Sequence, residues 1–306
     1  MISQEARDLF AANVKAMTAG DAAHLASQLL PDDVSRLKDI AYVHDGDAAH
    51  LLDIYTPADA EEGAALPVIV DFHGGGLYYG NKENNECRDM LLARQGFAVV
   101  NANYRLVPSV SFPAQLADAM AVLDWIRDHG AEYGLDAERV CVTGDSAGGA
   151  LALYLCAANG STQLAGVLGL WQSGIEVHAL VVTSGMFRLQ GGVHANALSY
   201  YMEGYLQTPA DHIKVNPYLD LDKLIVDGDV PPIYMITSVE DFIADNTYEL
   251  ARILHARHKD HAMSVWPKGR ERVLGHVFNI VQAGDPEAGE AHQVICDIAD
   301  YCKRYI

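Results

Sequence analysis

Short apolar runs alternate with longer amphipathic segments along most of the chain. The runs at residues 67–72 and 139–143 are rich in apolar, β-branched residues, as expected of strands that are covered on both faces of a sheet. In the segments that follow such runs, apolar residues recur every three or four positions, which places them on one face of a helix. This alternation predicts a mostly parallel sheet with helices on both of its faces.

The predicted elements extend over almost the whole length of the chain. The expected strands lie at residues 38–43, 49–55, 67–72, 98–103, 139–143, 177–184, 232–238 and 262–266. The first two of them flank a polar turn that contains Gly46, so they are expected to form a hairpin. The expected helices lie at residues 85–95, 115–129, from 150 onward, 246–259 and 287–305.

The N-terminal segment, residues 1–37, precedes the first predicted strand and has a helical pattern. Apolar residues recur there at three- and four-residue steps, for example at Val14 and Met17. Residues 22–30 are predicted to form a second short helix that ends at Pro31. Two amphipathic helices ahead of the sheet fit either a cap element over a site or a simple packing arm, and the pattern leaves both open.

A second segment, residues 185–230, interrupts the alternation of strands and helices. It is rich in tyrosine, has a helical pattern near residues 197–206 and contains no strand-like run. We interpret it as an insertion. The chain is therefore predicted to be a single domain, residues 1–306, with cap elements from residues 1–37 and from residues 185–230.

The amino-acid composition excludes some classes of binding partner and indicates a cellular compartment. Half of the 306 residues are hydrophobic and the formal net charge is −20, which argues against nucleic acid or an anionic membrane surface as a partner. No apolar run of 18 residues and no secretory signal pattern is present. The five cysteines form no C-x-x-C pair, so reduced thiols in a cytoplasmic protein are expected. The sequence predicts no cofactor and no metal, and it leaves the oligomeric state open, a homodimer included.

Candidate chemistry begins at the turn that follows the strand at residues 139–143. The turn contains Gly144, Ser146 and Gly148 in the G-x-S-x-G pattern, with a strand before it and a helix after it. Such a turn exposes the serine hydroxyl at the top of the sheet. The helix N-terminus that starts there aims its free N–H groups at whatever the serine attacks. On its own, however, the motif is equally compatible with a glycine-rich turn that contains a bystander serine.

A serine nucleophile needs a base, and the base needs an orienting carboxylate. Catalytic groups in such sheets gather at the carboxyl ends of the strands, and Asp241 follows the strand at residues 232–238. Its neighbour Glu240 is a rival, and so is Asp245, which has the character of a helix N-cap. His276 lies in the loop after the last strand and is the predicted base. The other late histidines lie on or just after a basic helix and are expected to be solvated: His255, His258 and His261.

Acyl transfer also requires N–H donors for the developing oxyanion. The backbone of Ala147 is expected to supply one of them. Gly74 and Gly75 follow the strand at residues 67–72, and their backbones can approach a substrate closely because they have no side chains. His73 is expected to brace this loop by hydrogen bonds rather than to act as a base.

Several long motifs occur together in one order along the chain. They are His73-Gly74-Gly75-Gly76, Asn103-Tyr104-Arg105-Leu106, Gly144-Asp145-Ser146-Ala147-Gly148-Gly149 and Gly275-His276-Val277-Phe278. With Asp241, and over roughly residues 38–305, they resemble the hormone-sensitive-lipase-like family of esterases. The chain order serine, aspartate, histidine is that of α/β-hydrolases. The resemblance implies an α/β-hydrolase sheet of about eight strands, a cap over the site, and carboxylesterase activity on short acyl chains.

The resemblance also assigns roles to residues beside the catalytic ones, and it has departures. It implies that Asp145, Tyr104 and Arg105 are structural. The loop at residues 269–276 is longer than is usual in the family, and Phe242 stands where proline is common. These departures concern substrate preference more than chemistry.

The predicted activity is hydrolysis of small esters, with acyl groups from acetyl to about butyryl, through an acyl-enzyme formed on Ser146. Crowded aromatic residues near the oxyanion loop favour a small acyl group, unless these residues are ordinary packing. The residues expected to line the pocket are Leu77, Tyr78, Tyr79, Met186, Phe187 and Tyr205. Two alternatives are an amide-cleaving relative, such as an arylformamidase or a peptidase with the same triad, and a non-catalytic small-molecule receptor.

Overall fold

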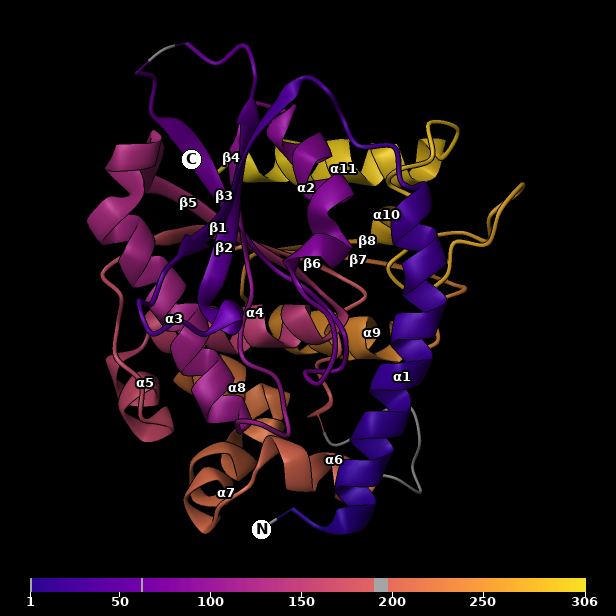
Figure 1. The fold of residues 1–306 in the computed structure, drawn as a ribbon. Helices are drawn as coiled ribbons and strands as arrows, with labels where there is room; N and C mark the ends of the chain where they lie inside the picture. Colours follow the sequence, from indigo (N-terminus) through magenta and orange to yellow (C-terminus); the bar gives the residue numbers. More distant parts are fainter. Residues whose placement is uncertain (1, 62, 190–197) are drawn as a thin grey trace.

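An eight-stranded sheet forms the centre of the computed structural model, which describes residues 2–61, 63–189 and 198–306 (Figure 1). The strand order is β1-β2-β4-β3-β5-β6-β7-β8. β2 is antiparallel to both of its neighbours, and all the other pairs are parallel, which confirms the mostly parallel sheet. The strands are β1 (Val34–Ala41), β2 (Leu51–Pro57), β3 (Leu66–Phe72), β4 (Ala98–Ala102), β5 (Leu135–Asp145), β6 (Val177–Thr183), β7 (Ile233–Ser238) and β8 (His261–Trp266).

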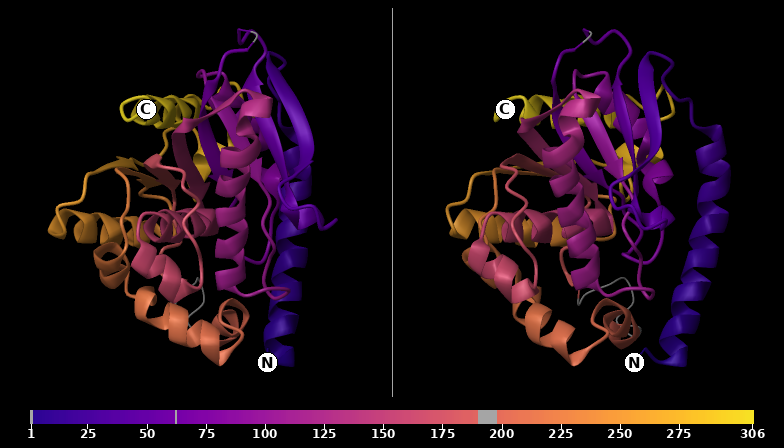
Figure 2. Two further views of the ribbon diagram at one scale, coloured as in Figure 1. Left: turned by 90° about the vertical axis from the view of Figure 1, so that its left-hand side faces the viewer. Right: turned by 60° about the vertical axis from the view of Figure 1, so that its left-hand side comes forward.

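Helices cover both faces of this sheet, as Figures 1 and 2 show. Alternate side chains of a strand point to opposite faces. Val68 and Val70 of β3 therefore belong to one apolar core, whereas Ile69 belongs to the other. The first core contains residues of α3 (Phe112–His129), α4 (Ser146–Asn159) and α9 (Ala244–Ala256), and the second contains residues of α2 (Glu86–Ala93) and α11 (Gly289–Cys302).

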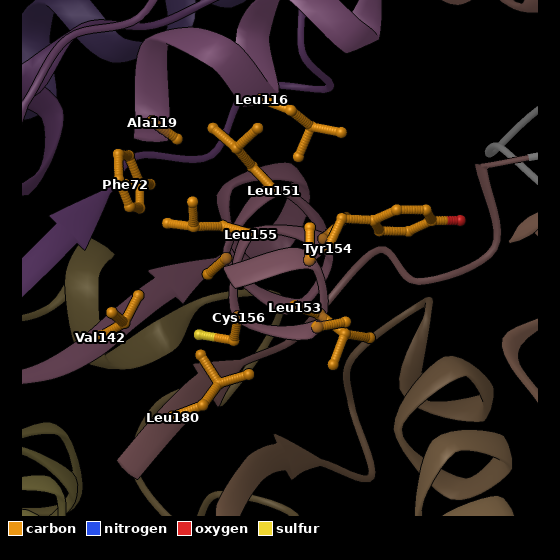
Figure 3. Close-up of a cluster of buried hydrophobic side chains, with 14 of the residues drawn as sticks. Phe72, Leu116, Ala119, Val142, Leu151, Leu153, Tyr154, Leu155, Cys156 and Leu180 are labelled. Carbon is orange, nitrogen blue, oxygen red and sulfur yellow. The ribbon is translucent and has the colours of Figure 1, made fainter. Parts of the chain in front are cut away.

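Helix α4 lies against the middle of the sheet, and all fourteen of its residues are buried. Figure 3 shows Leu151 and Leu155 of this helix among Phe72 and Val142 of the sheet and Leu116 of α3. A helix that is apolar all around is stable only when it is buried on every side. Its first residue is Ser146, so the candidate nucleophile is the first residue of a fully buried helix.

The N-terminal segment forms one long helix, α1 (Gln4–Ser27), rather than the two helices predicted. Its N-cap Ser3 accepts a hydrogen bond from the Ala6 N–H. No proline separates the two predicted segments, and Gly20 is tolerated within the helix. α1 runs along one side of the molecule and packs against α6 (Leu198–Tyr205) (Figures 1 and 2).

The segment at residues 185–230 contains the predicted helix as α6, and no strand lies in its described part. It also contains α7 (Pro209–Val215) and α8 (Leu221–Asp227), which the sequence pattern did not predict. α8 contacts α4 and α9 and is therefore part of the helical layer beside the sheet. Two further α-helices are α5 (Thr162–Leu168) and α10 (Phe278–Val281). Within the described residues, no helix has both the length and the apolar character needed to cross a membrane.

Candidate active site

The turn from β5 into α4 has the tight geometry that the sequence motif predicts. Ser146 has a φ of 49°, a left-handed conformation that a non-glycine residue rarely adopts and that is often found at active sites. A β-carbon on Gly148 would collide with the carbonyl oxygens of Phe72 and His73, and one on Gly144 would lie 2.6 Å from the Gly148 carbonyl carbon. Glycine is therefore required on both sides of the serine.

Three residues that follow three different strands form one chain of hydrogen bonds. The distance from His276 Nε2 to Ser146 Oγ is 2.9 Å, and the distance from His276 Nδ1 to Asp241 Oδ1 is also 2.9 Å. Asp241 follows β7 and His276 follows β8. The structure thus brings together the nucleophile, base and carboxylate that were predicted from chain order.

The environment of Asp241 fixes the orientation of the imidazole. Thr237 Oγ1 donates to Asp241 Oδ2 at 2.9 Å, and the Ile243 N–H donates to Oδ1 at 3.1 Å. Burial disfavours the charged carboxylate, but the hydrogen bonds from His276 and from the Ile243 N–H help to outweigh this effect, and the pKa of Asp241 is lowered. Because the ionised carboxylate only accepts hydrogen bonds, His276 carries its proton on Nδ1 and presents Nε2 as the acceptor for the Ser146 hydroxyl.

The rival carboxylates have other roles. Glu240 Oε2 accepts hydrogen bonds from the N–H groups of Leu274 at 2.8 Å and Gly269 at 3.1 Å, and these two donors lower the pKa of Glu240. Glu240 therefore holds the loop that bears His276. Asp245 is the second residue of α9 and not its N-cap, because the helix begins at Ala244, two residues earlier than that interpretation required.

The loop after β3 corrects one of the predicted oxyanion donors. The N–H of Gly74 donates to Asp145 Oδ1 at 2.9 Å, so this group is occupied and is not available to a substrate. Among the described residues, the N–H groups of Gly75 and Gly76 have no hydrogen-bond partner. Gly75 has a φ of 112°, and a β-carbon there would collide with the Tyr79 carbonyl oxygen. The N–H of Ala147 lies in the first turn of α4, where no intrahelical acceptor exists.

Asp145 belongs to a buried polar network behind the oxyanion loop. Asn85 Nδ2 donates to Asp145 Oδ1 at 2.9 Å and to Asp71 Oδ2 at 2.7 Å. Arg88 pairs with Asp71 at 2.5 Å and with Asp89 at 2.9 Å. Burial, together with the nearby charge of Asp71, raises the pKa of Asp145 to about 6. Asp145 thus positions the Gly74 loop, in line with the structural role that the resemblance implied.

His73 braces the same loop from the other side. Its Nδ1 donates to the Gly74 carbonyl oxygen at 2.7 Å, and its ring stacks on Tyr104 with 4.5 Å between centroids. The Tyr104 hydroxyl donates to the His73 carbonyl oxygen at 2.7 Å. Burial lowers the pKa of His73, so its imidazole stays neutral. Arg105 is held by Asp118 through a hydrogen bond of 2.9 Å from Nε to Oδ2.

A cavity of about 370 Å³ opens onto Ser146 and His276. Of the pocket residues predicted from the sequence, Tyr78, Tyr79, Met186 and Tyr205 line it. Leu77 and Phe187 do not, which corrects that part of the prediction. Leu77 has a φ of 67° and is fully buried, and Phe187 is 1% exposed; both side chains belong to the apolar core.

The sequence predicted a cap element at residues 1–37, but it did not identify which residues of α1 line the cavity, nor that Tyr201 does. The lining residues of α1 are Asn13, Ala16, Met17, Asp21 and Leu25. Four of these five lie at four-residue steps and therefore share one face of the helix. This face includes polar residues, so a search for apolar periodicity does not identify it. Asn13 Nδ2 donates to the Tyr201 hydroxyl at 2.8 Å, and Tyr79 donates to Asp21 Oδ2 at 2.9 Å.

A row of tyrosine rings forms one wall of the cavity. Tyr78 and Tyr201 stack with 5.8 Å between centroids, and Tyr201 and Tyr205 stack with 6.3 Å between centroids. The Tyr205 hydroxyl donates to the Gly76 carbonyl oxygen at 3.0 Å. This bond links α6 directly to the oxyanion loop, so the wall and the loop are held in one arrangement.

Comparison with known proteins places this site in a family. The model of the BD-FAE family matches residues 52–220, which is more than half of the chain. The chain belongs to the BD-FAE family. The matched segment contains the oxyanion loop and Ser146, whereas Asp241 and His276 lie beyond it.

Individual relatives of this BD-FAE family member are named as esterases. Esterase LipI of Mycobacterium tuberculosis is 38% identical over 104 residues, which are 33% of this chain and 32% of LipI. An acetyl esterase of Salmonella schwarzengrund is 26% identical over 231 residues, which are 70% of this chain and 68% of that enzyme. The chain spans less than half of the length of the first two curated relatives that it matches, 32% and 48%.

A solved structure has the same fold as this chain over nearly the whole length of both proteins. Esterase B from Lactobacillus rhamnosis, inhibited by a C4-C4 SN3 tributyrin phosphonate, superposes with a TM-score of 0.90 at 25% identity, covering 99% of this chain and 97% of that one. The predicted α/β-hydrolase fold and the resemblance to hormone-sensitive-lipase-like esterases are thereby confirmed.

Proposed function

We propose that this BD-FAE family member is a serine carboxylesterase that hydrolyses small esters with acyl groups from acetyl to about butyryl. The observation that supports this most strongly is the hydrogen-bonded chain from Ser146 through His276 to Asp241, which opens onto a cavity. A hydroxyl, a base and a buried carboxylate in this order are what nucleophilic attack on a carbonyl requires.

In the first step, Ser146 Oγ attacks the ester carbonyl carbon while His276 Nε2 takes the hydroxyl proton. Asp241 stabilises the imidazolium that forms. The carbonyl oxygen becomes an oxyanion, and the donors proposed for it are the N–H groups of Gly75, Gly76 and Ala147. Each such donor contributes on the order of 3 kcal/mol to transition-state stabilisation in enzymes of this type.

In the second half, His276 returns the proton to the oxygen of the leaving alcohol as the carbon–oxygen bond breaks. The acyl group is then attached to Ser146. A water molecule takes the place of the alcohol, gives a proton to His276 and attacks the acyl carbon. Collapse of the second tetrahedral intermediate releases the carboxylic acid and restores the Ser146 hydroxyl.

The proposed preference for short acyl groups rests on the wall of the cavity and on the relatives. Tyr78, Tyr201 and Tyr205 are stacked on one another, and Tyr205 is bonded to the oxyanion loop, so this wall cannot retreat easily from a long chain. One relative is named an acetyl esterase, and the inhibitor bound to Esterase B carries C4 groups.

The decisive variant is Ser146→Ala. We expect it to abolish hydrolysis of p-nitrophenyl acetate and butyrate and to prevent labelling by a fluorophosphonate probe, because both reactions need the Oγ nucleophile. The matched control is Ser109→Ala, which truncates an exposed serine outside the cavity and is expected to keep full activity. Substantial ester hydrolysis by Ser146→Ala would disprove the mechanism.

Acyl preference is tested by a series of p-nitrophenyl esters from acetate to octanoate. We expect kcat/KM to be highest between acetate and butyrate and to fall for the longer chains. A maximum of kcat/KM at octanoate would contradict the proposed short-chain preference but would leave the proposed mechanism unchanged. Faster cleavage of an arylformamide than of phenyl acetate would instead favour an amide-cleaving enzyme.

A further inference from the structure

One large aromatic side chain at the cavity is left exposed instead of being packed into the core. Phe242, next to the triad carboxylate in sequence, lines the cavity and is 64% exposed. Its ring lies on the imidazole of His276, with 4.6 Å between centroids and an interplanar angle of 44°. A phenyl ring that lies at the surface in contact with a catalytic base can also contact the part of the substrate that exchanges a proton with that base.

In the proposed reaction, His276 protonates the oxygen of the leaving alcohol. His276 Nε2 must come within about 2.6–3.2 Å of the alcohol oxygen to protonate it. The first carbon atoms of the alcohol therefore lie beside the imidazole, where the Phe242 ring is. The acyl group is in a different place, because its carbonyl oxygen must face the oxyanion loop while its carbon is bonded to Ser146.

Several apolar residues line the cavity together with Phe242 and His276. Val277, Ile280 and Val281 follow His276 in sequence and line the cavity, and Val281 is 46% exposed. Arg188 lines the cavity as well, but its guanidinium is paired with Glu249. The surroundings of the alcohol oxygen thus offer apolar contact.

We propose that Phe242 is a specificity-determining residue on the leaving-group side, which selects esters whose alcohol carries a ring close to the ester oxygen. This inference rests on the proposed esterase activity. The ring of such an alcohol would pack on Phe242 in an offset or edge-to-face arrangement, as aromatic side chains do with one another. A small alkyl alcohol would leave the phenyl surface exposed to water.

The test compares benzyl acetate with ethyl acetate, which share an acyl group and release alcohols of similar acidity. We expect the unmodified protein to show a higher kcat/KM for benzyl acetate. Phe242→Ala is expected to lower the benzyl-to-ethyl ratio by about three- to tenfold, the range that one aromatic contact supplies. Phe242→Tyr keeps the ring and is expected to preserve the ratio.

The matched control is Val239→Ala in the same loop. Val239 is 57% exposed but does not line the cavity, so its truncation is expected to leave the ratio unchanged. An equal loss for both esters in Phe242→Ala would overturn the inference, because the ring would then act only through the placement of His276. An unchanged ratio would overturn it too. An unmodified protein without activity on any ester would overturn the esterase proposal itself, and the inference with it.

Discussion

Two neighbouring side chains at the turn between β5 and α4 have different tasks. Ser146 faces the cavity, whereas the Asp145 carboxylate is bonded to Gly74 on the loop behind the oxyanion position. The nucleophile, Asp241 and His276 could be predicted from the sequence because each lies in the turn or loop that follows the carboxyl end of a predicted strand. The hydrogen bond from the Gly74 N–H to Asp145 could not be predicted, because the two residues are 71 positions apart and no local sequence pattern indicates such a bond.

Asp241 is the triad member whose removal tests orientation rather than nucleophilicity. In Asp241→Asn the amide can donate to His276 Nδ1, which would stabilise the wrong tautomer and leave Nε2 protonated. We expect kcat for p-nitrophenyl acetate to fall by roughly 10³- to 10⁴-fold with little change in KM. Asp245→Asn, at an exposed residue of the same region, is expected to stay within a few-fold of the unmodified protein. Retention of a tenth of the activity by Asp241→Asn would contradict this role.

At the level of elements, local periodicity predicted α6 and every strand, but it did not show how α1 is built or where it packs. α1 was predicted as two helices, the second of them at residues 22–30 and ending at Pro31. The helix continues because no proline intervenes, and residues in its first half have partners on α6. The hydrogen bond from the Ser3 N–H to Glu203 Oε2, at 2.7 Å, joins residues 200 positions apart. Contacts over such distances have no counterpart in the local sequence.

The packing of α1 on α6 depends on Gly204. A β-carbon there would lie 2.6 Å from a ring carbon of Phe10, which is 1% exposed. Phe10 itself packs on Tyr78 and Tyr201, with 5.3 and 5.8 Å between centroids. A larger residue at position 204 must therefore push α6 and its tyrosines away from α1.

Two glycine-to-alanine substitutions distinguish the effect of this close packing from the effect of helix propensity on stability. We expect Gly204→Ala to lower the free energy of unfolding by about 1–3 kcal/mol and to raise KM, because Tyr201 and Tyr205 move. Gly20→Ala, within α1, is expected to raise the free energy of unfolding by up to about 1 kcal/mol, because nothing lies within 4 Å of the added β-carbon. Urea unfolding and ester kinetics measure both effects. Equal stabilisation by the two substitutions would show that α1 and α6 are not in close contact.

For the molecule as a whole, the alternation of strands and helices was sufficient to predict a mostly parallel sheet covered on both faces. The order of the strands was not predictable from that alternation, because it depends on pairings such as β3 with β5 that join distant segments. The buried charges were also not predictable. Asp71, Asp89 and Asp145 gather around Arg88, and burial raises the pKa of both Asp89 and Asp145.

This buried network makes global stability depend on pH in a definite direction. The pKa of Asp145 is raised from 3.8 to about 6 in the folded protein, so the native state binds the proton more tightly than the unfolded chain does. The contribution to stability is complete below about pH 4 and is lost as the pH rises to about 6, with a total change of about 3 kcal/mol. Ionisation of this one carboxyl group therefore opposes folding at neutral pH.

Asp145→Asn removes the ionisable group and keeps an oxygen acceptor for the Gly74 N–H. We expect the stability of this variant relative to the unmodified protein to increase by about 3 kcal/mol between pH 4 and pH 7. Urea unfolding at a series of pH values measures the difference. A difference that does not vary with pH would mean that Asp145 titrates in the folded state as it does in the unfolded chain.

The pairing of α1 with α6 has a consequence for biosynthesis. A ribosome makes α1 before α6, and the last residue of α6 follows the end of α1 by about 180 residues. At about 5–20 residues per second, roughly ten to forty seconds pass before α6 is available to pack on α1. During this interval the Asn13, Met17 and Leu25 side chains that will line the cavity have no cavity to face. A nascent-chain experiment is therefore expected to find α1 accessible to proteases until residue 205 has left the exit tunnel, and protected afterwards.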